Sequence, residues 1–325
     1  MTPPGTGTAG GVALLALAAL GLLLALTVAG EVLRARLPPG RSVPGVDTFN
    51  ARVRSWWTMA ALLGLALLLG RPGVVALFAF AAFAALREFA TYTAKAREDH
   101  GMLATAFFVV LPLQFLWVLL GAEGLFTVFV PVHVFLLLPL IAVLTGAPQR
   151  FLTRVAETQW ALMVCVYCTS HVPALLTLDL RGPNGAPNGA PAGGLVLLIP
   201  FLVLAVQGGE IAAAAAERRW GRHPIAPDLS PRSWEAAGLG ILAAAAVGLL
   251  LAWLTPFGPG GAALMAGVAA AAGLGGTLVL AAIKRERGVR DWSHLIPGQG
   301  GLPDQAGGVL FAAPLFCHLA AWGLG

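Results

Sequence analysis

Charged residues are scarce in this chain: they make up 11% of its 325 residues, against roughly 25% in an ordinary soluble domain. Hydrophobic residues make up 58%, and the mean hydropathy is +0.82. These values exclude an ordinary soluble protein and indicate an all-α fold, a polytopic bundle of transmembrane helices. The net charge is +5, but no basic surface interleaved with aromatic residues is visible, so we expect no nucleic-acid partner.

Cysteine is also rare, with three residues in the chain. Cys165 and Cys168 form a CxxC inside an apolar run without a second ligand pair, and Cys317 lies alone. This pattern excludes a disulfide framework and favours packing over metal or redox chemistry. Lys and Arg are missing ahead of the first apolar run, so the basic region of a secretory signal peptide is absent, and we predict that this run is a retained span.

Ten apolar runs approach the length of about 20 residues that a helix needs to cross a bilayer. They cover residues 11–29, 56–70, 73–89, 103–121, 124–145, 159–178, 194–216, 236–255, 260–283 and 306–324. Between the second and third runs, the segment Arg71-Pro72-Gly73 predicts a turn. We expect residues 31–55 to form a polar connector and residues 183–194, rich in Pro, Asn and Gly, to form a flexible linker.

The basic residues between these runs predict the topology. Lys and Arg accumulate in cytoplasmic loops, and passing the ten runs alternately through the membrane places 18 of the 20 basic residues on one side. Arg71 and Arg181 lie on the other side. We therefore predict about ten spans, with both termini outside the cytoplasm and the polar loops after the seventh and ninth runs inside it.

The most polar stretch of the carboxyl-terminal third is Lys284–Gln305. It contains Lys284, Arg285, Arg287, Arg290, Asp291, Gly298, Gly300, Gly301 and Asp304. Cations can hold a polyphosphate, carboxylates can hold magnesium, and glycines let backbone N–H groups approach phosphate oxygens. The stretch therefore favours a site for a phosphorylated molecule, and the alternative is a solvated basic loop that only fixes the topology.

Polar groups near the seventh run form a second candidate region. Glu210 lies inside this run, where an ionisable residue is costly and is a functional candidate; the alternative is a carboxyl that pairs within the bundle. In the following loop, Ser230 and Pro231 predict a helix start that could hold phosphate or simply cap a span. Glu88, at the end of the third run, is expected to be solvated.

Two blocks of sequence carry a family resemblance. The segments IKRERGVRDWSHLIPGQGGLPDQ and WGRHPIAPDLSPRSWE resemble the signature blocks of the phosphatidate cytidylyltransferases, or CDP-diacylglycerol synthases, and NARVRSWWTM and ALREFAT look like a bacterial branch. The resemblance covers about residues 50–325, a cytidylyltransferase-like membrane domain, and leaves residues 1–49 as an amino-terminal span and connector. It implies a multi-pass protein of the bacterial inner membrane, with CTP and phosphatidate as substrates, Mg²⁺ as cofactor, the lipid bilayer as partner and a homodimer as a family expectation.

The resemblance also implies residue roles. Asp291 and Asp304 match the acidic positions of the family and are the metal-ligand candidates, together with Glu210, which stands where the family has Asp. Lys284 and Arg285 join the two aspartates as candidate catalytic residues. The candidate substrate-binding residues are Arg290, Ser230, Arg232, Arg222, Gly298, Gly300 and Gly301.

Several positions depart from the family pattern. They are Thr277 and Leu280 for acidic residues, Ala281 for Ser, Gln299 for His, Gln305 for Arg and Gly307 for the second Asp. We predict transfer of CMP from CTP to phosphatidate, giving CDP-diacylglycerol and pyrophosphate. Because the departures fall on the chemistry, the alternatives are a catalytically degenerate lipid-binding relative, a cytidylyltransferase with another substrate, a CTP-dependent lipid kinase and a membrane transporter, although the broken-helix symmetry of transporters is not visible.

Overall fold

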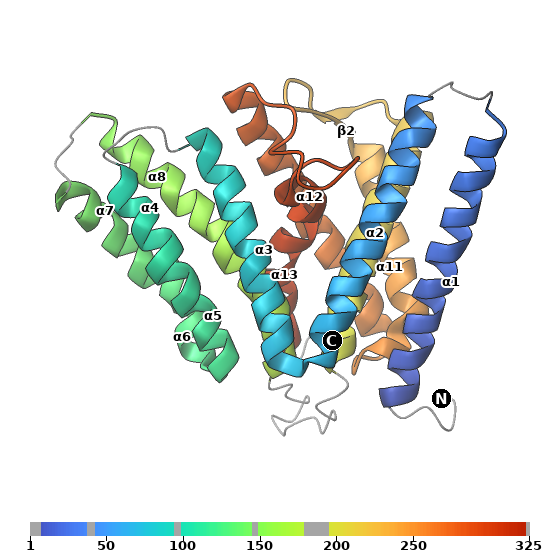
Figure 1. Ribbon diagram of the computed structural model, residues 1–325, viewed down its shortest axis with the longest axis horizontal. Coiled ribbons are helices and arrows are strands. Elements are labelled where there is room, and N and C mark those ends of the chain that lie inside the picture. The colour runs from blue at the N-terminus through green and yellow to red at the C-terminus, as the bar shows by residue number, and fades with distance from the viewer. Residues whose placement is uncertain (1–7, 38–42, 94–98, 145–148, 179–194, 323–325) are drawn as a thin grey trace.

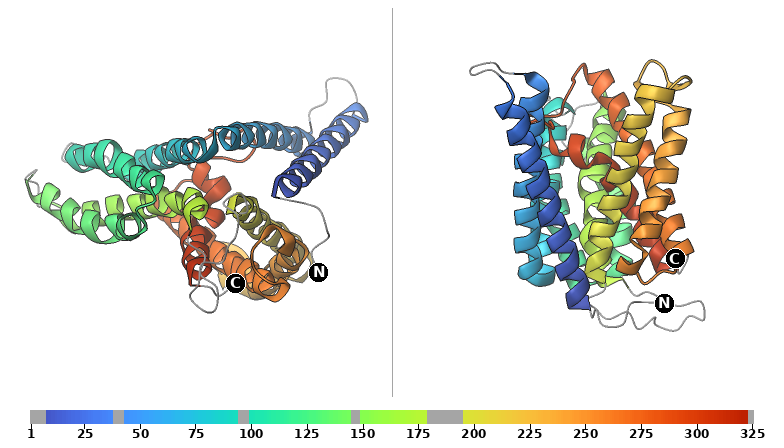
Figure 2. Two further views of the ribbon diagram at one scale, coloured as in Figure 1. Left: turned by 90° about the horizontal axis from the view of Figure 1, so that it is seen from below. Right: turned by 90° about the vertical axis from the view of Figure 1, so that its right-hand side faces the viewer.

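Long helical rods build the molecule, and they spread apart toward one end of the bundle (Figures 1 and 2). The computed structural model describes residues 8–37, 43–93, 99–144, 149–178 and 195–322. Arg41, Lys95, Arg97, Arg181 and the expected linker 183–194 lie outside the described residues. The first helix begins, and the last helix ends, at the same end of the bundle (Figure 2).

The described elements begin and end as follows. In chain order they are α1 (Thr8–Ala35), α2 (Pro44–Leu68), α3 (Gly70–Thr93), α4 (His100–Thr105), η2 (Ala106–Val110), α5 (Leu111–Leu120), α6 (Glu123–Val128), η3 (Phe129–Val134), α7 (Phe135–Leu144), α8 (Phe151–Leu162), η4 (Met163–Cys168), α9 (Thr169–Ala174), η5 (Leu175–Thr177), η6 (Leu195–Leu197), α10 (Leu198–Trp220), β1 (Pro224–Ala226), β2 (Ser230–Ser233), α11 (Trp234–Leu250), η7 (Ala252–Leu254), α12 (Pro259–Arg287) and α13 (Leu302–Ala321). The elements η2, η3 and η4 are π-helical segments. Each joins the helices before and after it into one continuous rod: α4 with α5, α6 with α7, and α8 with α9.

Each of the ten predicted runs coincides with a helical rod. Seven rods are long and apolar enough, by length and composition, to cross a membrane, among the described residues. The rod α11 is apolar but has 17 residues, and α2 and α13 are outside those seven. The polytopic helical bundle is therefore confirmed, while the count of ten spans stays a prediction for α2, α11 and α13.

Two predicted boundaries were wrong. The turn between the second and third rods lies at Leu69 and Gly70, not at Arg71-Pro72-Gly73, because Gly70 adopts φ 69°, a conformation that glycine takes readily. Arg71 and its neighbours instead form the first turn of α3. The expected connector 31–55 is also largely helical: α1 runs to Ala35 and α2 starts at Pro44, with proline in a first-turn position that suits it. Residue 50, where the membrane domain was expected to begin, therefore lies inside α2.

Small residues let α10, α11, α12 and α13 pack closely. A Cβ on Gly209 would lie 3.0 Å from the carbonyl oxygen of Gly240, and a Cβ on Gly273 would lie 3.0 Å from that of Gly308. Close approach through glycine is a usual way for membrane helices to associate, because van der Waals contacts replace the hydrophobic driving force there. These four helices carry the two polar blocks, so their packing fixes where the blocks meet.

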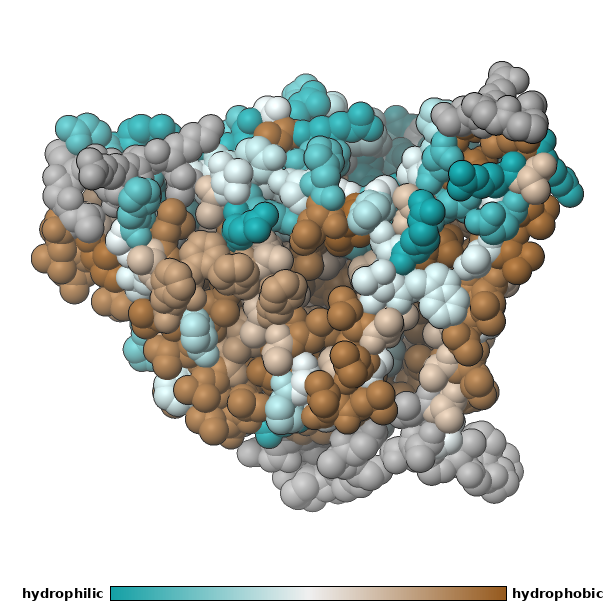
Figure 3. Space-filling model, in the orientation of Figure 1, coloured by the Kyte–Doolittle hydropathy of each residue, from teal (hydrophilic) through white to brown (hydrophobic). Residues whose placement is uncertain are grey.

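Polar residues gather at one end of the bundle. Figure 3 shows them as a band along its upper edge, above a broad hydrophobic surface. The chain segments at this end include the β1–β2 hairpin and the connection between α12 and α13 (Figure 1). The two polar blocks thus lie at the same end of the bundle, and the location of this end in the cytoplasm stays a prediction.

Candidate functional site

The connection between α12 and α13, residues Gly288–Gly301, forms a loop with a tight turn at its tip. The N–H of Gln299 donates to the carbonyl of Ile296 at 3.0 Å, and the N–H of Ile296 donates to the carbonyl of Gly300 at 2.8 Å. Pro297 and Gly298 occupy the central turn positions, and Gly298 has φ 77°. Proline followed by glycine at positive φ is the signature of a type II turn.

The amino-terminal half of α2 supports this tip. The Nε of Arg52 donates to the carbonyl of Gly298 at 3.0 Å, and the hydroxyl of Ser55 donates to the carbonyl of Pro297 at 3.1 Å. A Cβ on Gly298 would lie 3.2 Å from the carbonyl oxygen of Thr48. The tip is therefore held by a helix that lies more than 200 residues away in the sequence.

Asp304, in the first turn of α13, closes the base of the loop. Its Oδ2 accepts hydrogen bonds from the N–H of Trp292 at 2.8 Å and from that of Gly301 at 2.9 Å. Its Oδ1 lies 2.6 Å from Nζ of Lys284, and the Asp304 side chain is 7% exposed. Both oxygens of this candidate metal ligand are thus engaged by the protein itself.

Helix α3 holds the same loop from the other side. Glu88 is buried, and its two oxygens accept from the hydroxyl of Ser293 at 2.7 Å and from the N–H of Leu302 at 2.9 Å. The ring of Trp292 is also buried and stacks on Phe89, with 4.8 Å between ring centroids. The expectation that Glu88 is solvated was therefore wrong, because the loop folds back over the end of α3 and covers the carboxylate.

The predicted phosphate-binding glycines have packing reasons of their own. A Cβ on Gly301 would lie 2.3 Å from Oε2 of Glu88, and a Cβ on Gly300 would lie 2.7 Å from Oδ2 of Asp304. Gly300 also has φ 89°. These glycines let the two carboxylates approach the backbone, and an additional role in binding phosphate stays a prediction.

The cationic side chains of this region differ in exposure. Arg285 and Arg290 are exposed, as is Asp291, next to the buried Trp292. Lys284 is half-buried in its ion pair, and Arg287 points its Nη2 at Oε1 of Glu157 on α8, at 2.6 Å. Arg285 and Arg290 are thus the cations of this loop that are placed to meet a ligand from solution.

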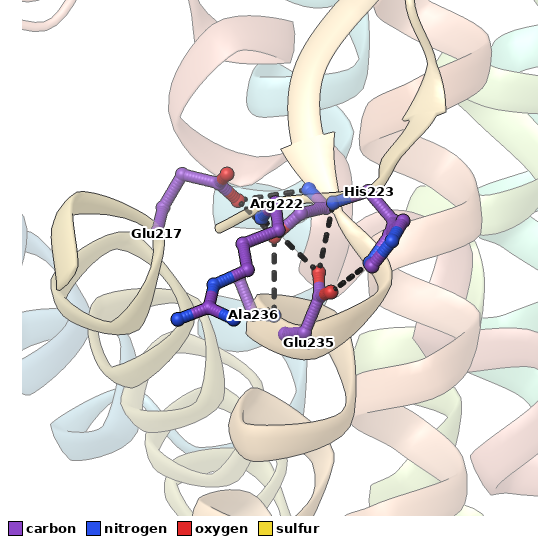
Figure 4. Close-up of polar contacts among 6 residues, drawn as sticks. Glu217, Arg222, His223, Glu235 and Ala236 are labelled. Carbon is purple, nitrogen blue, oxygen red and sulfur yellow. Dashed lines mark hydrogen bonds and ion pairs between the residues drawn. The ribbon is translucent and has the colours of Figure 1, made fainter. Parts of the chain in front are cut away.

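The β1–β2 hairpin is the second block, and two carboxylates cross over it (Figure 4). Glu217, from the helix before the hairpin, accepts from the N–H of Ser233 at 2.8 Å and from its hydroxyl at 3.1 Å. Glu235, from the helix after the hairpin, accepts from the N–H of His223 at 3.2 Å and from that of Arg222 at 3.4 Å, and also contacts Nδ1 of His223. Each end of the hairpin is therefore held by the helix at its opposite end.

The Glu235 carboxyl stays ionised in this arrangement. It lies ahead of the apolar part of α11, where hydrogen bonds from the His223 side chain and from backbone N–H groups lower its pKa to about 2. The negative charge also suits the amino-terminal turn of a helix. Glu235 therefore belongs to the scaffold of the hairpin.

The predicted helix start at Ser230 was wrong. Ser230 lies in β2, where its Oγ accepts from the N–H of Arg232 at 3.3 Å. Helix α11 starts at Trp234, and its cap is Ser233, whose Oγ accepts from the N–H of Ala236 at 3.3 Å. Because Glu217 already bonds to Ser233, this helix start is occupied by a carboxylate of the chain.

A cavity with a mostly apolar lining lies between α10, α11 and α12, beneath the hairpin. Glu210, Arg232 and Thr277 line it together with small residues, and its empty space measures about 280 Å³, including space open to the surroundings. The Oε1 atom of Glu210 is buried without a hydrogen-bond partner among the described residues. A Cβ on Gly308 of α13 would lie 2.1 Å from this oxygen, so the Glu210 side chain of α10 lies directly against α13, the helix that follows the loop.

The three metal-ligand candidates do not form a cage. Among the described residues, no group of three or more His, Cys, Asp or Glu side chains is placed to hold a metal ion. Mg²⁺ is commonly held by one or two carboxylates together with substrate phosphates and water. Glu210, with its unpartnered oxygen, and the exposed Asp291 fit such a role, whereas Asp304 is paired with Lys284, and its role as a metal ligand stays a prediction.

Two departures from the family pattern lie against each other. A Cβ on Gly307 would lie 2.4 Å from Cδ1 of Leu280, and Leu280 is buried. The apolar side chain of α12 thus fills the space that an acidic side chain on α13 would need. The two substitutions belong together sterically.

The sequence reasoning missed several residues that shape this region: Glu88, Glu217, Glu235 and Trp292. One signal could have found the first of them. An acidic residue at the end of an apolar run is costly unless it has partners, and the same rule that singled out Glu210 applies to Glu88. No pattern in the sequence indicates the contacts of Glu217, Glu235 and Trp292, because these contacts form only when the loops fold against the helices.

Comparisons with known proteins point in one direction. The sequence pattern of the Cytidylyltransferase family matches residues 50–322. The uncharacterized protein YnbB of Escherichia coli (strain K12) is 29% identical over 303 residues, which is 91% of this chain and 94% of that protein. The phosphatidate cytidylyltransferase of Mycobacterium leprae is 34% identical over 114 residues, 34% of this chain and 36% of that protein. That of Pseudomonas aeruginosa is 34% identical over 149 residues, 41% of this chain and 50% of that protein, so these matches span about a third to a half of each enzyme.

Proposed function

Because the chain belongs to the cytidylyltransferase family, we propose that it transfers CMP from CTP to phosphatidate. In this reaction an oxygen of the lipid phosphate attacks the α-phosphorus of CTP. The bond from that phosphorus to the bridging oxygen breaks, and pyrophosphate leaves with the electron pair. The products are CDP-diacylglycerol and pyrophosphate.

One observation carries the proposal: both polar blocks lie at the same end of the helical bundle, and Glu210 of α10 lies against α13, the helix that follows the loop. Glu210, before the hairpin, reaches Gly308, which lies four residues after Asp304. The cavity that Glu210 shares with Arg232 lies between α10, α11 and α12, where most of its other lining residues are apolar. The proposal places the lipid phosphate at this cavity, with CTP approaching from water at the polar end of the bundle.

The residues take roles that follow from their exposure. Arg285 and Arg290 meet the triphosphate, and their guanidinium groups suit phosphate geometry. Arg232 meets the lipid phosphate at the cavity, where water screens the charge of this half-buried side chain less than that of an exposed one. Arg222, exposed at the base of the hairpin, is a further contact for the nucleotide.

Mg²⁺ would be held by Glu210 or Asp291 together with phosphate oxygens. When bound, it would offset the negative charge that develops on the transferring and leaving phosphates. By holding Mg²⁺, the carboxylates of this chain would determine where the ion lies relative to the phosphates. Asp304 instead positions Lys284 and the loop.

A second candidate function is a non-catalytic relative that binds anionic lipid or nucleotide. The observations that favour it are the ion pair of Asp304 with Lys284 and the filling of the acidic position by Leu280 against Gly307. Both remove negative charge that a metal ion would need. A protein of this kind would bind phosphatidate through Arg232 but form no product.

The experiment that separates the two measures product and binding on one preparation. The purified full chain, in lipid nanodiscs that contain phosphatidate, receives labelled CTP and Mg²⁺. Radiolabelled CDP-diacylglycerol in the lipid fraction supports the transferase. Binding of phosphatidate by native mass spectrometry without product, while a phosphatidate cytidylyltransferase is active in the same assay, supports the non-catalytic relative and overturns the proposal.

A further inference from the structure

Two carboxylates close the loop between α12 and α13 at its base. Asp304 accepts from the N–H groups of Trp292 and Gly301, while Glu88 accepts from the hydroxyl of Ser293 and the N–H of Leu302. Trp292 and Ser293 at the start of the loop, and Gly301 and Leu302 at its end, are therefore held by the same two acids. We name Glu88, Asp304 and the four groups that they bind the carboxylate clasp.

The two acids of the clasp belong to different parts of the bundle. Asp304 is local, since it follows the loop by a few residues, whereas Glu88 comes from α3, more than 200 residues earlier in the chain. Glu88 is 4% exposed, and the ring of its neighbour Phe89 lies flat against Trp292 with an interplanar angle of 18°. Glu88 and Phe89 together fix the loop against the membrane bundle.

The clasp holds the residues that the proposed reaction needs. Arg290 and Asp291 directly precede Trp292 and Ser293, so the placement of these two side chains depends on where the clasp holds the backbone. Arg290 and Asp291 are themselves exposed, and the described contacts of the loop are made by their neighbours. Without a fixed backbone, the approach of Arg290 to a triphosphate would cost ordering entropy.

We propose that Glu88 is the positioning residue of this loop: it orients Arg290 and Asp291 for CTP by holding Ser293 and Leu302. This inference rests on the proposed function, because it assigns Glu88 to the CTP-binding step of that reaction. Glu88 contacts no reacting atom in this account and acts through the two loop residues. A displacement of the loop by about 1 Å can cost up to roughly a hundredfold in rate.

The Leu302 amide reports on the clasp without any activity. Leu302 opens α13, so its N–H has no carbonyl of its own helix to donate to, and Pro303 after it has no N–H. In hydrogen–deuterium exchange of the full chain in nanodiscs, we expect Glu88→Ala to speed exchange at Leu302 about tenfold or more. The N–H groups of Trp292 and Gly301 remain on Asp304 and should change less.

The KM for CTP is a second readout, because a loss of folded protein does not change it. We expect Glu88→Ala to raise the KM for CTP about tenfold, whereas a smaller folded fraction lowers only the apparent kcat. Glu88→Gln should stay within about threefold of the wild type, because its carbonyl can accept from Leu302 while its amide donates to the Ser293 hydroxyl. Glu88→Leu, of similar volume, can do neither and should behave like Glu88→Ala.

Two control variants match the changes. Thr91→Ala alters an exposed residue one turn along α3 whose hydroxyl bonds to its own helix, and Glu286→Gln removes one exposed charge beside the loop. Both should leave Leu302 exchange and KM unchanged. Unchanged Leu302 exchange in Glu88→Ala, or equal behaviour of Glu88→Gln and Glu88→Leu, overturns the inference. If the wild type forms no product, the proposed function fails. The positioning role of Glu88 is then tested by two measurements on the same variants: hydrogen exchange at Leu302 and the affinity for CTP.

Discussion

The Nζ atom of Lys284 lies 2.6 Å from Oδ1 of Asp304, so a residue expected to hold phosphate is bonded to one expected to hold metal. The pair joins the last turn of α12 to the first turn of α13. The remaining oxygen of Asp304 accepts two backbone N–H groups. Asp304 therefore holds the base of the loop in this structure, its predicted role as a metal ligand stays a prediction, and Asp291 is the exposed acid of the loop.

Alanine substitution of Asp304 and of Asp291 should have different effects on the stability of the protein. Asp304→Ala removes an ion pair and two hydrogen bonds to the backbone, and we expect it to lower the free energy of unfolding by about 2 kcal/mol. Asp291→Ala should leave stability unchanged, because surface substitutions away from special features have little effect. Thermal unfolding midpoints of both variants in one detergent check this. Equal midpoints would contradict the assignment of Asp304 to the scaffold.

The Lys284–Asp304 pair should show energetic coupling. Lys284→Met and Asp304→Asn each leave the partner without its counter-charge, whereas the double variant leaves neither charge behind. We expect the double variant to be less destabilised than the sum of the two, by about 1 kcal/mol. A double-mutant cycle of unfolding free energies measures this. Strict additivity would mean that the ion pair contributes nothing to the closure of the loop.

Two serines three residues apart should differ in their contribution to α11. Ser233 caps the helix, so Ser233→Ala should cost about 1 kcal/mol, while Ser230→Ala, in β2, should cost much less. The two variants remove the same atom and are matched controls for one another. Thermal unfolding of both decides the matter, and a larger loss for Ser230→Ala would restore Ser230 as the helix start.

Leu280 and Gly307 should behave as a pair. Gly307→Asp alone forces the buried Leu280 side chain to move and buries a carboxyl beside it, and we expect a loss of about 2 kcal/mol. Leu280→Ala combined with Gly307→Asp provides room and should recover part of this loss. Unfolding midpoints of the Gly307→Asp variant and of the double variant, compared with the wild type, test the idea. If Gly307→Asp alone is neutral, the steric link between the two positions is wrong.

Much of the fold was open to prediction because the bilayer imposes simple rules. The length of the apolar runs and the position of the basic residues located all ten rods, and α10 even includes Glu210 as expected. Boundaries failed where a backbone conformation decided them. The helix α3 starts at Gly70 because glycine can adopt positive φ there, and no periodicity in the sequence records that choice.

The site was less predictable, since its contacts join distant parts of the chain. The polar stretch and the apolar run around Glu210 singled out Asp291, Asp304 and Glu210, and the family resemblance implied their roles. The sequence does not say that Glu88 turns inward or that Lys284 bonds to Asp304. Such contacts depend on how the loop folds back on α3. The glycines illustrate the same limit: Gly301 was predicted from phosphate chemistry, while its place in the structure also requires room for Glu88.

The most direct test of the central claim is the rate of CDP-diacylglycerol formation from labelled CTP and phosphatidate by the purified full chain with Mg²⁺. Two variants are measured beside the wild type. Asp291→Ala removes the loop acid that is assigned to the reaction, and Glu286→Ala removes an exposed acid to which no role is assigned. The account predicts product from the wild type and Glu286→Ala, and a loss of about a hundredfold or more in Asp291→Ala. No product from folded wild-type protein, with a known phosphatidate cytidylyltransferase active in the same vesicles, would contradict it.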